Sequence, residues 1–167
     1  SGSILLQNNT GYAIVLRGSA TQVSTVILKN TGTIVGGIWT LAGNDYISQS
    51  AGSLTGEISL GAGTDTVSIT GGTLTGNTDL GAGNDSFTAS GGALVGKTMM
   101  GNDSDMMTIT GAVDLTGTIL LDGGNSTDAT VTDILGTTTA ATNELNFVTT
   151  TQSLAGSLMK NWQTVLL

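Results

Sequence analysis

A repeat of twenty residues runs through the middle of the sequence and limits the folds that the chain can adopt. The segment Leu-Gly-Ala-Gly-Thr-Asp at 60–65 returns as Leu-Gly-Ala-Gly-Asn-Asp at 80–85. A shortened copy at 41–45 and a degenerate one at 100–105 extend the series, so that aspartates recur every twenty residues: Asp45, Asp65, Asp85 and Asp105. A second motif, Gly-x-Leu-x-Gly, keeps this period. Two motifs in one register predict stacked units, none of which is stable alone.

Within each unit the apolar residues alternate, as Leu54, Ile58 and Leu60 show. A period of two is typical of half-buried strands, and the glycine-rich segments between them are turns. Stacking the units places like residues over one another in three inward ladders: Leu54, Leu74 and Leu94; Leu60, Leu80 and Met100; Val67, Phe87 and Met107. The absence of proline suits parallel ladders, which use nearly every backbone N–H. The sequence therefore predicts an all-β fold, a single-stranded parallel β-helix or β-solenoid with about 20 residues per coil.

We expect residues 1–167 to form one solenoid segment of about eight coils and roughly 40 Å, taking the strand spacing as the rise per coil. The repeat continues at 114–117 after a one-residue insertion, and the register loosens from Thr118 onward. The segment 121–128 resembles the Leu-Gly-Ala-Gly-Asn-Asp turn with two residues added, and 137–142 predicts an exposed polar loop. Strand character resumes at 146–148 and 161–167. The start at Ser1-Gly2-Ser3, with no signal peptide, favours a segment excised from a larger protein.

The composition excludes many functions. There is no cysteine and no histidine, so disulfides, thiol nucleophiles, imidazole bases and zinc fingers are ruled out. The net charge is -8, and only four basic residues are scattered along the chain, which argues against nucleic acid and anionic membranes as partners. No apolar run reaches the roughly 20 residues that span a bilayer. We therefore expect no enzymatic activity and no insertion of this segment into a membrane.

Several segments together resemble a known class of exported proteins. They are the run Gly-Tyr-Ala-Ile-Val-Leu at 11–16, the turn at 30–34, the Leu-Gly-Ala-Gly-Asn-Asp repeats, and Asn-Trp-Gln-Thr-Val at 161–165. They are similar to the passenger domains of Gram-negative autotransporter adhesins. This resemblance implies a right-handed parallel β-helix, export to the cell surface, anchoring in the outer membrane, and binding to a host-cell or matrix ligand or to neighbouring bacteria. The sequence has neither the signal peptide nor the barrel of that family.

The segment 81–87 is also similar to the calcium-binding nonapeptide of RTX β-rolls. This second resemblance makes Asp65, Asp85 and Asp105 candidate calcium ligands, with repulsion between stacked carboxylates as a further argument. However, Leu80 replaces the first glycine of the nonapeptide, and the period is twenty instead of nine. The alternative is that each aspartate hydrogen-bonds its own turn, while Gly61, Gly63, Gly81 and Gly83 supply positive φ angles.

Other candidate residues favour structural roles. Asp103 and Asp105 resemble an acid/base pair, but no basic residue adjoins them, so we expect a solvated turn. Met99, Met100, Met106 and Met107 form a cluster of which Met100 and Met107 fall on inward positions. The aromatic residues that could contact a glycan are Trp39, Tyr46 and Trp162, and we expect Trp162 to pack on the end of the stack.

The leading hypothesis is a non-enzymatic, extracellular segment that displays a binding surface on a rod. The alternatives are a calcium-dependent secreted solenoid, a polysaccharide-active β-helix enzyme, and an ice-binding solenoid. Ice binding calls for paired Thr-x-Thr in every coil, whereas Thr73-x-Thr75 lies beside Ser53-x-Thr55 and Ala93-x-Val95.

Overall fold

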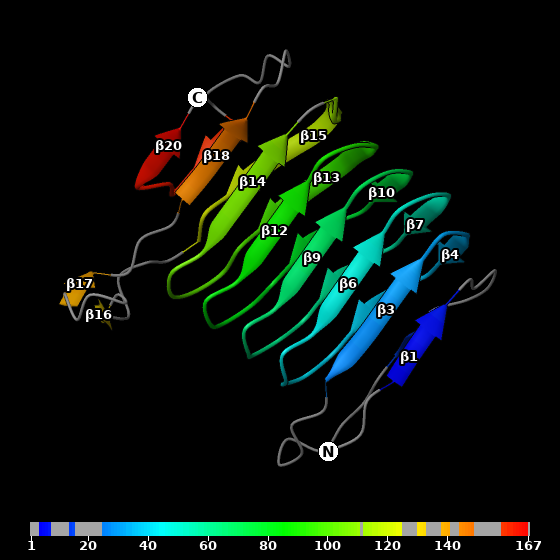
Figure 1. Ribbon diagram of the computed structural model, residues 1–167, viewed down its shortest axis with the longest axis horizontal. Helices are drawn as coiled ribbons and strands as arrows, with labels where there is room; N and C mark the ends of the chain where they lie inside the picture. Colours follow the sequence, from blue (N-terminus) through cyan, green and yellow to red (C-terminus); the bar gives the residue numbers. More distant parts are fainter. Residues whose placement is uncertain are drawn as a thin grey trace.

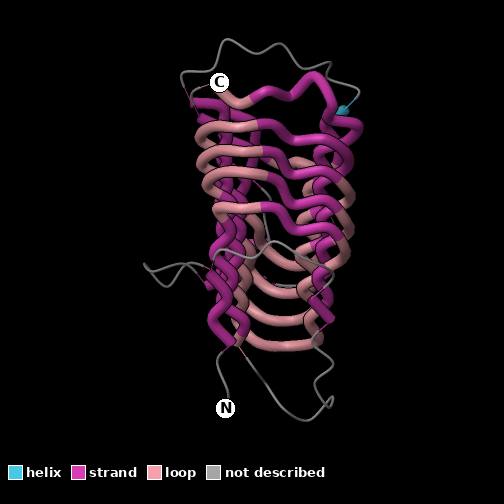
Figure 2. The backbone as a smooth tube through the Cα atoms, turned by 90° about the vertical axis from the view of Figure 1, so that its right-hand side faces the viewer, coloured by secondary structure: helices cyan, strands magenta, loops and turns pink. Residues whose placement is uncertain are grey.

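The chain folds into a β-solenoid in which successive coils stack along one axis (Figures 1 and 2). The computed structural model describes residues 4–7, 14–15, 25–110, 112–124, 130–132, 138–140, 144–148 and 158–166. It shows about five turns of about 20 residues each, fewer than the eight coils expected, and almost no helix, which confirms the predicted fold class. No helix in the described ranges is long and apolar enough to cross a membrane.

One side of each coil belongs to an eight-stranded parallel sheet, which we call sheet A; its arrows form the front row of Figure 1. Neighbouring strands pair at the predicted twenty-residue offset through the regular coils, where Val67 lies beside Phe87 and Phe87 beside Met107. In order, the strands are β1 (Ile4–Gln7), β3 (Val26–Asn30), β6 (Tyr46–Gln49), β9 (Thr66–Ile69), β12 (Ser86–Ala89), β14 (Met106–Thr110), β18 (Glu144–Val148) and β20 (Thr164–Leu166).

Another side of each coil contributes strands to a second parallel sheet, sheet B. In the regular coils a glycine with positive φ, such as Gly56 or Gly76, separates two strands, so that the chain bends between them. The strands are β2 (Ile14–Val15), β4 (Thr33–Val35), β5 (Ile38–Trp39), β7 (Ser53–Thr55), β8 (Ile58–Ser59), β10 (Thr73–Thr75), β11 (Thr78–Asp79), β13 (Ala93–Met99), β15 (Asp114–Asp122) and β19 (Met159–Lys160).

The core between the two sheets consists of the predicted ladders. Every member of the three ladders is at most 3% exposed, and Leu60, Leu80 and Met100 are fully buried. Backbone hydrogen bonds hold the coils in the same register; for example, the N–H of Leu60 donates to the carbonyl of Asp79 at 3.1 Å. Burial of apolar surface contributes about 25 cal/mol per Å². Each coil buries its apolar side chains against the adjacent coils, so the stability of one coil depends on its neighbours.

The register beyond β13 differs from the prediction. The one-residue insertion is present, since Ala93 pairs with Asp114, but two further irregularities follow along β15. They place Leu121 beside Thr98, although the sequence motif aligned Leu121 with Leu80. Gly123 therefore occupies the position that follows Met100 in the ladder. β-Bulges absorb single residues in this way without leaving the sheet.

Trp162 packs against the core at this end of the described stack, as predicted. A Cβ built on Gly123 would meet the Trp162 indole at 3.0 Å, and the indole Nε1 donates to the carbonyl of Leu121 at 3.0 Å. The bulky ring thus covers the place where the ladder has lost its own side chain.

A second correction concerns 137–142, predicted as an exposed loop. Thr138–Ala140 forms strand β17, which pairs antiparallel with β16 (Thr130–Thr132) in a separate two-stranded sheet. Threonine is β-branched and favours extended backbone, so a threonine-rich segment also supports strand pairing. The strand character predicted at 146–148 and 161–167 is confirmed by β18 and β20.

Candidate functional site

The repeat aspartates lie inside the solenoid rather than on its surface. Asp45, Asp65, Asp85 and Asp105 are 2, 0, 3 and 3% exposed, and they stack one per coil immediately before the strands of sheet A. We call this column the aspartate ladder. The prediction of a solvated turn is therefore wrong for Asp105, because the alternation of the strand directs this side chain inward.

Each ladder carboxyl is held by the coil before it. The backbone N–H of Asp45 donates to Oδ1 of Asp65 at 2.7 Å, that of Asp65 to Asp85 at 2.8 Å, and that of Asp85 to Asp105 at 2.9 Å. The N–H of Val26 donates in the same way to Asp45. The predicted hydrogen bond within the aspartate's own turn is thus replaced by a bond between coils, which satisfies a buried main-chain donor.

The second oxygen, Oδ2, of Asp45, Asp65 and Asp85 is buried without a hydrogen-bond partner. Burial, followed by the negative charge of Asp45, raises the pKa of Asp65 to about 6, against the lowering effect of its backbone hydrogen bond. Burial raises the pKa of Asp85 to about 8 and that of Asp105 to about 7. Burial also raises the pKa of Asp45. A carboxyl group in this setting favours its neutral form.

The calcium candidates Asp65, Asp85 and Asp105 are thus brought into one column, but each already accepts a main-chain N–H. In the described part of the chain no group of three or more acidic, histidine or cysteine side chains is placed to hold a metal ion. Gly61, Gly63, Gly81 and Gly83 have positive φ angles, as the alternative predicted.

Removal of divalent cations tests the calcium hypothesis directly. We expect EDTA to change the Tm by less than about 2 °C at neutral pH, since a ligand stabilises only the state that binds it. Thermal denaturation followed by circular dichroism, with added Ca²⁺ beside EDTA, measures this shift. A large calcium-dependent shift in the parent chain that disappears in Asp85→Asn would establish calcium binding instead.

Asp103 and Asp105, the candidate acid/base pair, differ in their exposure to solvent. Asp103 is partly exposed and has a φ of 80°, whereas Asp105 is buried. Asp103 and Asp105 therefore lack the shared open surface that two catalytic carboxyl groups need.

Among the methionines, Met100 and Met107 are fully buried, as predicted, and Met106 is exposed on the outer side of sheet A.

The outer side of sheet A carries an array of hydroxyl groups that the sequence had not assigned to this face. One column stacks Ser48, Ser68, Thr88 and Thr108 in register, and Thr66 stacks on Ser86 beside it. A third column follows the strand ends, at positions 50, 70, 90 and 110. We call this array the hydroxyl face; its members are Ser48, Ser50, Thr66, Ser68, Thr70, Ser86, Thr88, Ser90, Thr108 and Thr110.

The hydroxyl face is partly or fully exposed and contains no charged side chain. Along a column the spacing is the inter-strand distance of about 4.8 Å, and alternate residues on one strand lie about 7 Å apart. Tyr46 and Met106 end the Thr66 column at either side. The periodic signal for this face was present in the sequence, because serine or threonine occupies the positions between Val67 and Ile69 and between Phe87 and Ala89.

Sheet B presents less regular features. Thr73 pairs with Ser53 on one side and with Ala93 on the other. The paired threonine array is therefore incomplete on this sheet, as predicted. Trp39 is 38% exposed, and its indole lies directly over Gly37, where a Cβ would come within 2.0 Å of the ring. The absence of a side chain at Gly37 thus allows the indole ring of Trp39 to pack against the backbone.

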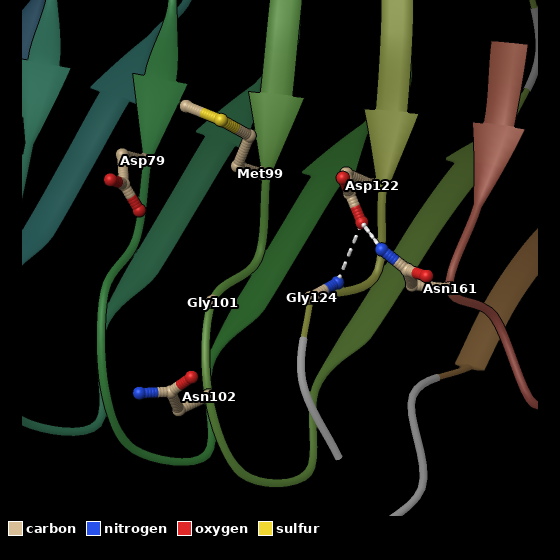
Figure 3. A pocket seen from close by; sticks show the side chains of 7 residues that line it. All are labelled: Asp79, Met99, Gly101, Asn102, Asp122, Gly124 and Asn161. Atoms are coloured by element: carbon tan, nitrogen blue, oxygen red, sulfur yellow. Dashed lines mark hydrogen bonds between the residues drawn. The ribbon is translucent and has the colours of Figure 1, made fainter. Parts of the chain in front are cut away.

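An open hollow of about 470 Å³ lies beside the end of β15 (Figure 3). Oδ1 of Asp122 accepts hydrogen bonds from the backbone N–H of Gly124 at 2.9 Å and from Nδ2 of Asn161 at 2.6 Å. Burial and the charge of Glu57 raise the pKa of Asp79 on the other side of the hollow. The hollow offers polar contacts but no arrangement of nucleophile and base; it is lined by Asp79, Met99, Gly101, Asn102, Asp122, Gly124 and Asn161.

A buried amide pair is a further feature that sequence reasoning missed. Asn30 and Gln49 occupy adjacent inward positions and are 1 and 0% exposed. Nδ2 of Asn30 donates to Oε1 of Gln49 at 2.6 Å, and Nε2 of Gln49 donates to the carbonyl of Ala51 at 2.6 Å. Ile69 and Ala89 follow in the same ladder.

No protein-family model, curated protein sequence or solved structure matches the chain. The fold nevertheless defines its class as a β-solenoid with parallel sheets.

Proposed function

We propose that the chain is a non-catalytic, adhesive segment of an exported bacterial surface protein, and that it binds neutral, hydroxyl-rich glycans through the hydroxyl face. The single observation that carries this proposal is the register of Ser48, Ser68, Thr88 and Thr108, which repeats one donor and acceptor group per coil. Each hydroxyl group both donates and accepts a hydrogen bond, which suits the hydroxyl groups of sugars.

The repetition compensates for weak individual contacts. A single hydrogen bond contributes about 1 kcal/mol in net terms, so one coil alone binds poorly. Stacked coils present the same group again at about 4.8 Å, and several contacts to one extended ligand act together. A glycan of the host-cell surface, of the matrix or of a neighbouring bacterium meets this requirement.

The charge of the chain supports a neutral ligand. The net charge is -8, so an acidic polysaccharide would be repelled at long range. Lys29 lies beside Ser48 at one end of the hydroxyl face and Glu144 lies beside Met106 at the other, with uncharged side chains along the columns between them. The setting on an exported, autotransporter-type protein is supported by the sequence resemblance and by the solenoid fold.

Removal of hydroxyl groups without loss of shape tests the proposal. We expect Ser68→Ala combined with Thr88→Val to weaken binding to neutral polysaccharides about thirtyfold, because two net hydrogen bonds of about 1 kcal/mol each are lost. Co-sedimentation with insoluble polysaccharides, or a glycan array, measures the affinity. The matched control is Ser53→Ala with Thr75→Val on sheet B, which should leave binding unchanged. Equal losses in both variants, or no binding by the parent, would contradict a glycan site on sheet A.

Ice binding is a second candidate, favoured by the even spacing of the same hydroxyl columns. A lattice of ordered water can match groups that repeat in two directions on one face. Ice-crystal growth, measured beside the polysaccharide assay, separates the two functions.

A further inference from the structure

The aspartate ladder places ionisable groups where a negative charge has little compensation. Asp65 and Asp85 are 0 and 3% exposed, and each has one oxygen on a main-chain N–H and one oxygen buried without a partner. Moving a carboxylate into such surroundings is far more costly than burying the neutral acid. The geometry alone therefore favours one protonation state.

The charged groups that face the ladder increase this preference. Asp85 is influenced by the negative charges of Asp65, Asp105 and Asp103, and Asp105 by that of Asp103. Glu144, the first residue of β18, donates its N–H to the carbonyl of Asp105 at 2.8 Å, but it pairs with Met106 on the outer side of sheet A and so lies outside the ladder.

Cations in the described part of the chain do not offset these charges. Lys29, Lys97 and Lys160 are all exposed, and none of them contributes to the pKa of a ladder member. Beside Asp45, the neutral hydroxyl of Thr40 donates to the carbonyl of Leu60 and brings no positive charge. Ionisation of the ladder would therefore place like charges on successive coils inside the fold.

We propose that the aspartate ladder is a proton-binding column that couples the solenoid to pH: the stack is most stable with the ladder protonated and loosens as the ladder ionises. Protons bind and leave at the Oδ2 atoms, and Oδ1 keeps its hydrogen bond from the preceding coil. The inference is independent of the glycan site on the outer surface.

The direction in which stability changes with pH follows from the raised pKa values of the ladder aspartates. The pKa is about 6 for Asp65, about 7 for Asp105 and about 8 for Asp85, against 3.8 for an unperturbed aspartate. The folded state therefore binds more protons than the unfolded chain between about pH 4 and about pH 8, so stability falls as the pH rises through this window. Ordinary surface carboxylates that form ion pairs produce the opposite trend.

Asparagine is a close substitute for a protonated ladder member. Its Oδ1 can accept the same main-chain N–H, and its amide is neutral at every pH of interest. Asp85→Asn removes the group whose charge is most strongly disfavoured. Asp114→Asn is the matched control, because Asp114 carries the same charge and lies on the outside, where it caps Thr116.

The experiment is thermal unfolding of the full chain at constant ionic strength, with EDTA present throughout, between about pH 5 and about pH 8.5. We expect the parent Tm to fall by on the order of 10 °C across this range. Asp85→Asn should show a clearly smaller fall, and Asp114→Asn should fall as the parent does. Measurement with EDTA excludes bound calcium as the cause of the trend.

A ¹³C NMR titration of the aspartate carboxyl carbons in the parent chain provides a second test that does not depend on the variant folding. It should show carboxyl groups that titrate above about pH 6. A parent Tm that stays constant or rises across the range would overturn the proposal. So would an Asp85→Asn variant with the full parental fall, or ladder carboxyls that all titrate below about pH 5. Failure of polysaccharide binding would leave it unaffected.

Discussion

Leu80→Asp is expected to leave the chain unfolded at room temperature. Leu80 is fully buried in the ladder between Leu60 and Met100, and no described basic side chain is inside the core to compensate a new charge. Burying an unpaired carboxylate costs several kcal/mol, which is comparable with the whole stability of a domain of this size. Far-UV circular dichroism and urea unfolding measure the loss.

Two control variants separate this effect from a general intolerance of substitution. Leu80→Met should cost less than about 1.5 kcal/mol, since Met100 already occupies the next place in the ladder. Thr88→Asp places the same charge on the outer side of sheet A and should retain the fold. If Leu80→Asp unfolded in urea as the parent does, the inward register of this ladder would be refuted.

Gly81→Ala is expected to have the second largest effect, with a loss of about 3 kcal/mol or more. Gly81 has a φ of 106°, and a Cβ at this position would lie 1.9 Å from the carbonyl oxygen of Gly61 in the preceding coil. Both the conformation and the approach of one backbone to the next exclude a side chain, so the turn would have to separate from its neighbour. The midpoint of urea unfolding reports the change.

Gly117→Ala is the matched control for the glycine prediction. The nearest atoms to a new Cβ at Gly117 belong to the side chain of Val95, which is 36% exposed and can rotate away. We expect a loss of less than about 1 kcal/mol. Equal losses at Gly81 and Gly117 would mean that coil-to-coil backbone contact does not decide the role of Gly81.

The stacking of the coils could be predicted because two regular periods, one within each strand and one between coils, are visible in the sequence. A period of two assigned Val67 and Ile69 to one side of a strand, and a period of twenty set Val67 over Phe87. Both periods are properties of the backbone, so they hold wherever the repeat is regular. The loosening of the register from Thr118 onward was predicted, but the two bulges along β15 that set Leu121 beside Thr98 were not, because a bulge leaves the residue pattern intact and changes only the pairing.

The orientation of the aspartates was misjudged although the signal was present. Asp65 alternates in phase with Val67 and Ile69, which places its side chain inward, and Thr66 alternates with Ser68 on the outside. A charged residue beside a glycine turn is usually solvated or bonded to its own turn, and this tendency favoured a solvated turn for Asp105 and a bond within the turn for the other repeat aspartates. The decisive fact is the main-chain N–H of the preceding coil, which needs an acceptor inside the fold.

The Asn30–Gln49 pair has a consequence for how the chain finds its correct order. Nearly identical coils are interchangeable partners, so a folding chain could loop out one repeat and still stack aliphatic side chains on aliphatic side chains. A slip that set Asn30 against Ile69 would bury the amide beside a methyl group and remove its bond to Gln49. Such an unsatisfied group costs about 1–3 kcal/mol. The hydrogen bond between the two amides therefore favours the correct stacking register of the coils that contain Asn30 and Gln49 over registers in which one repeat is skipped.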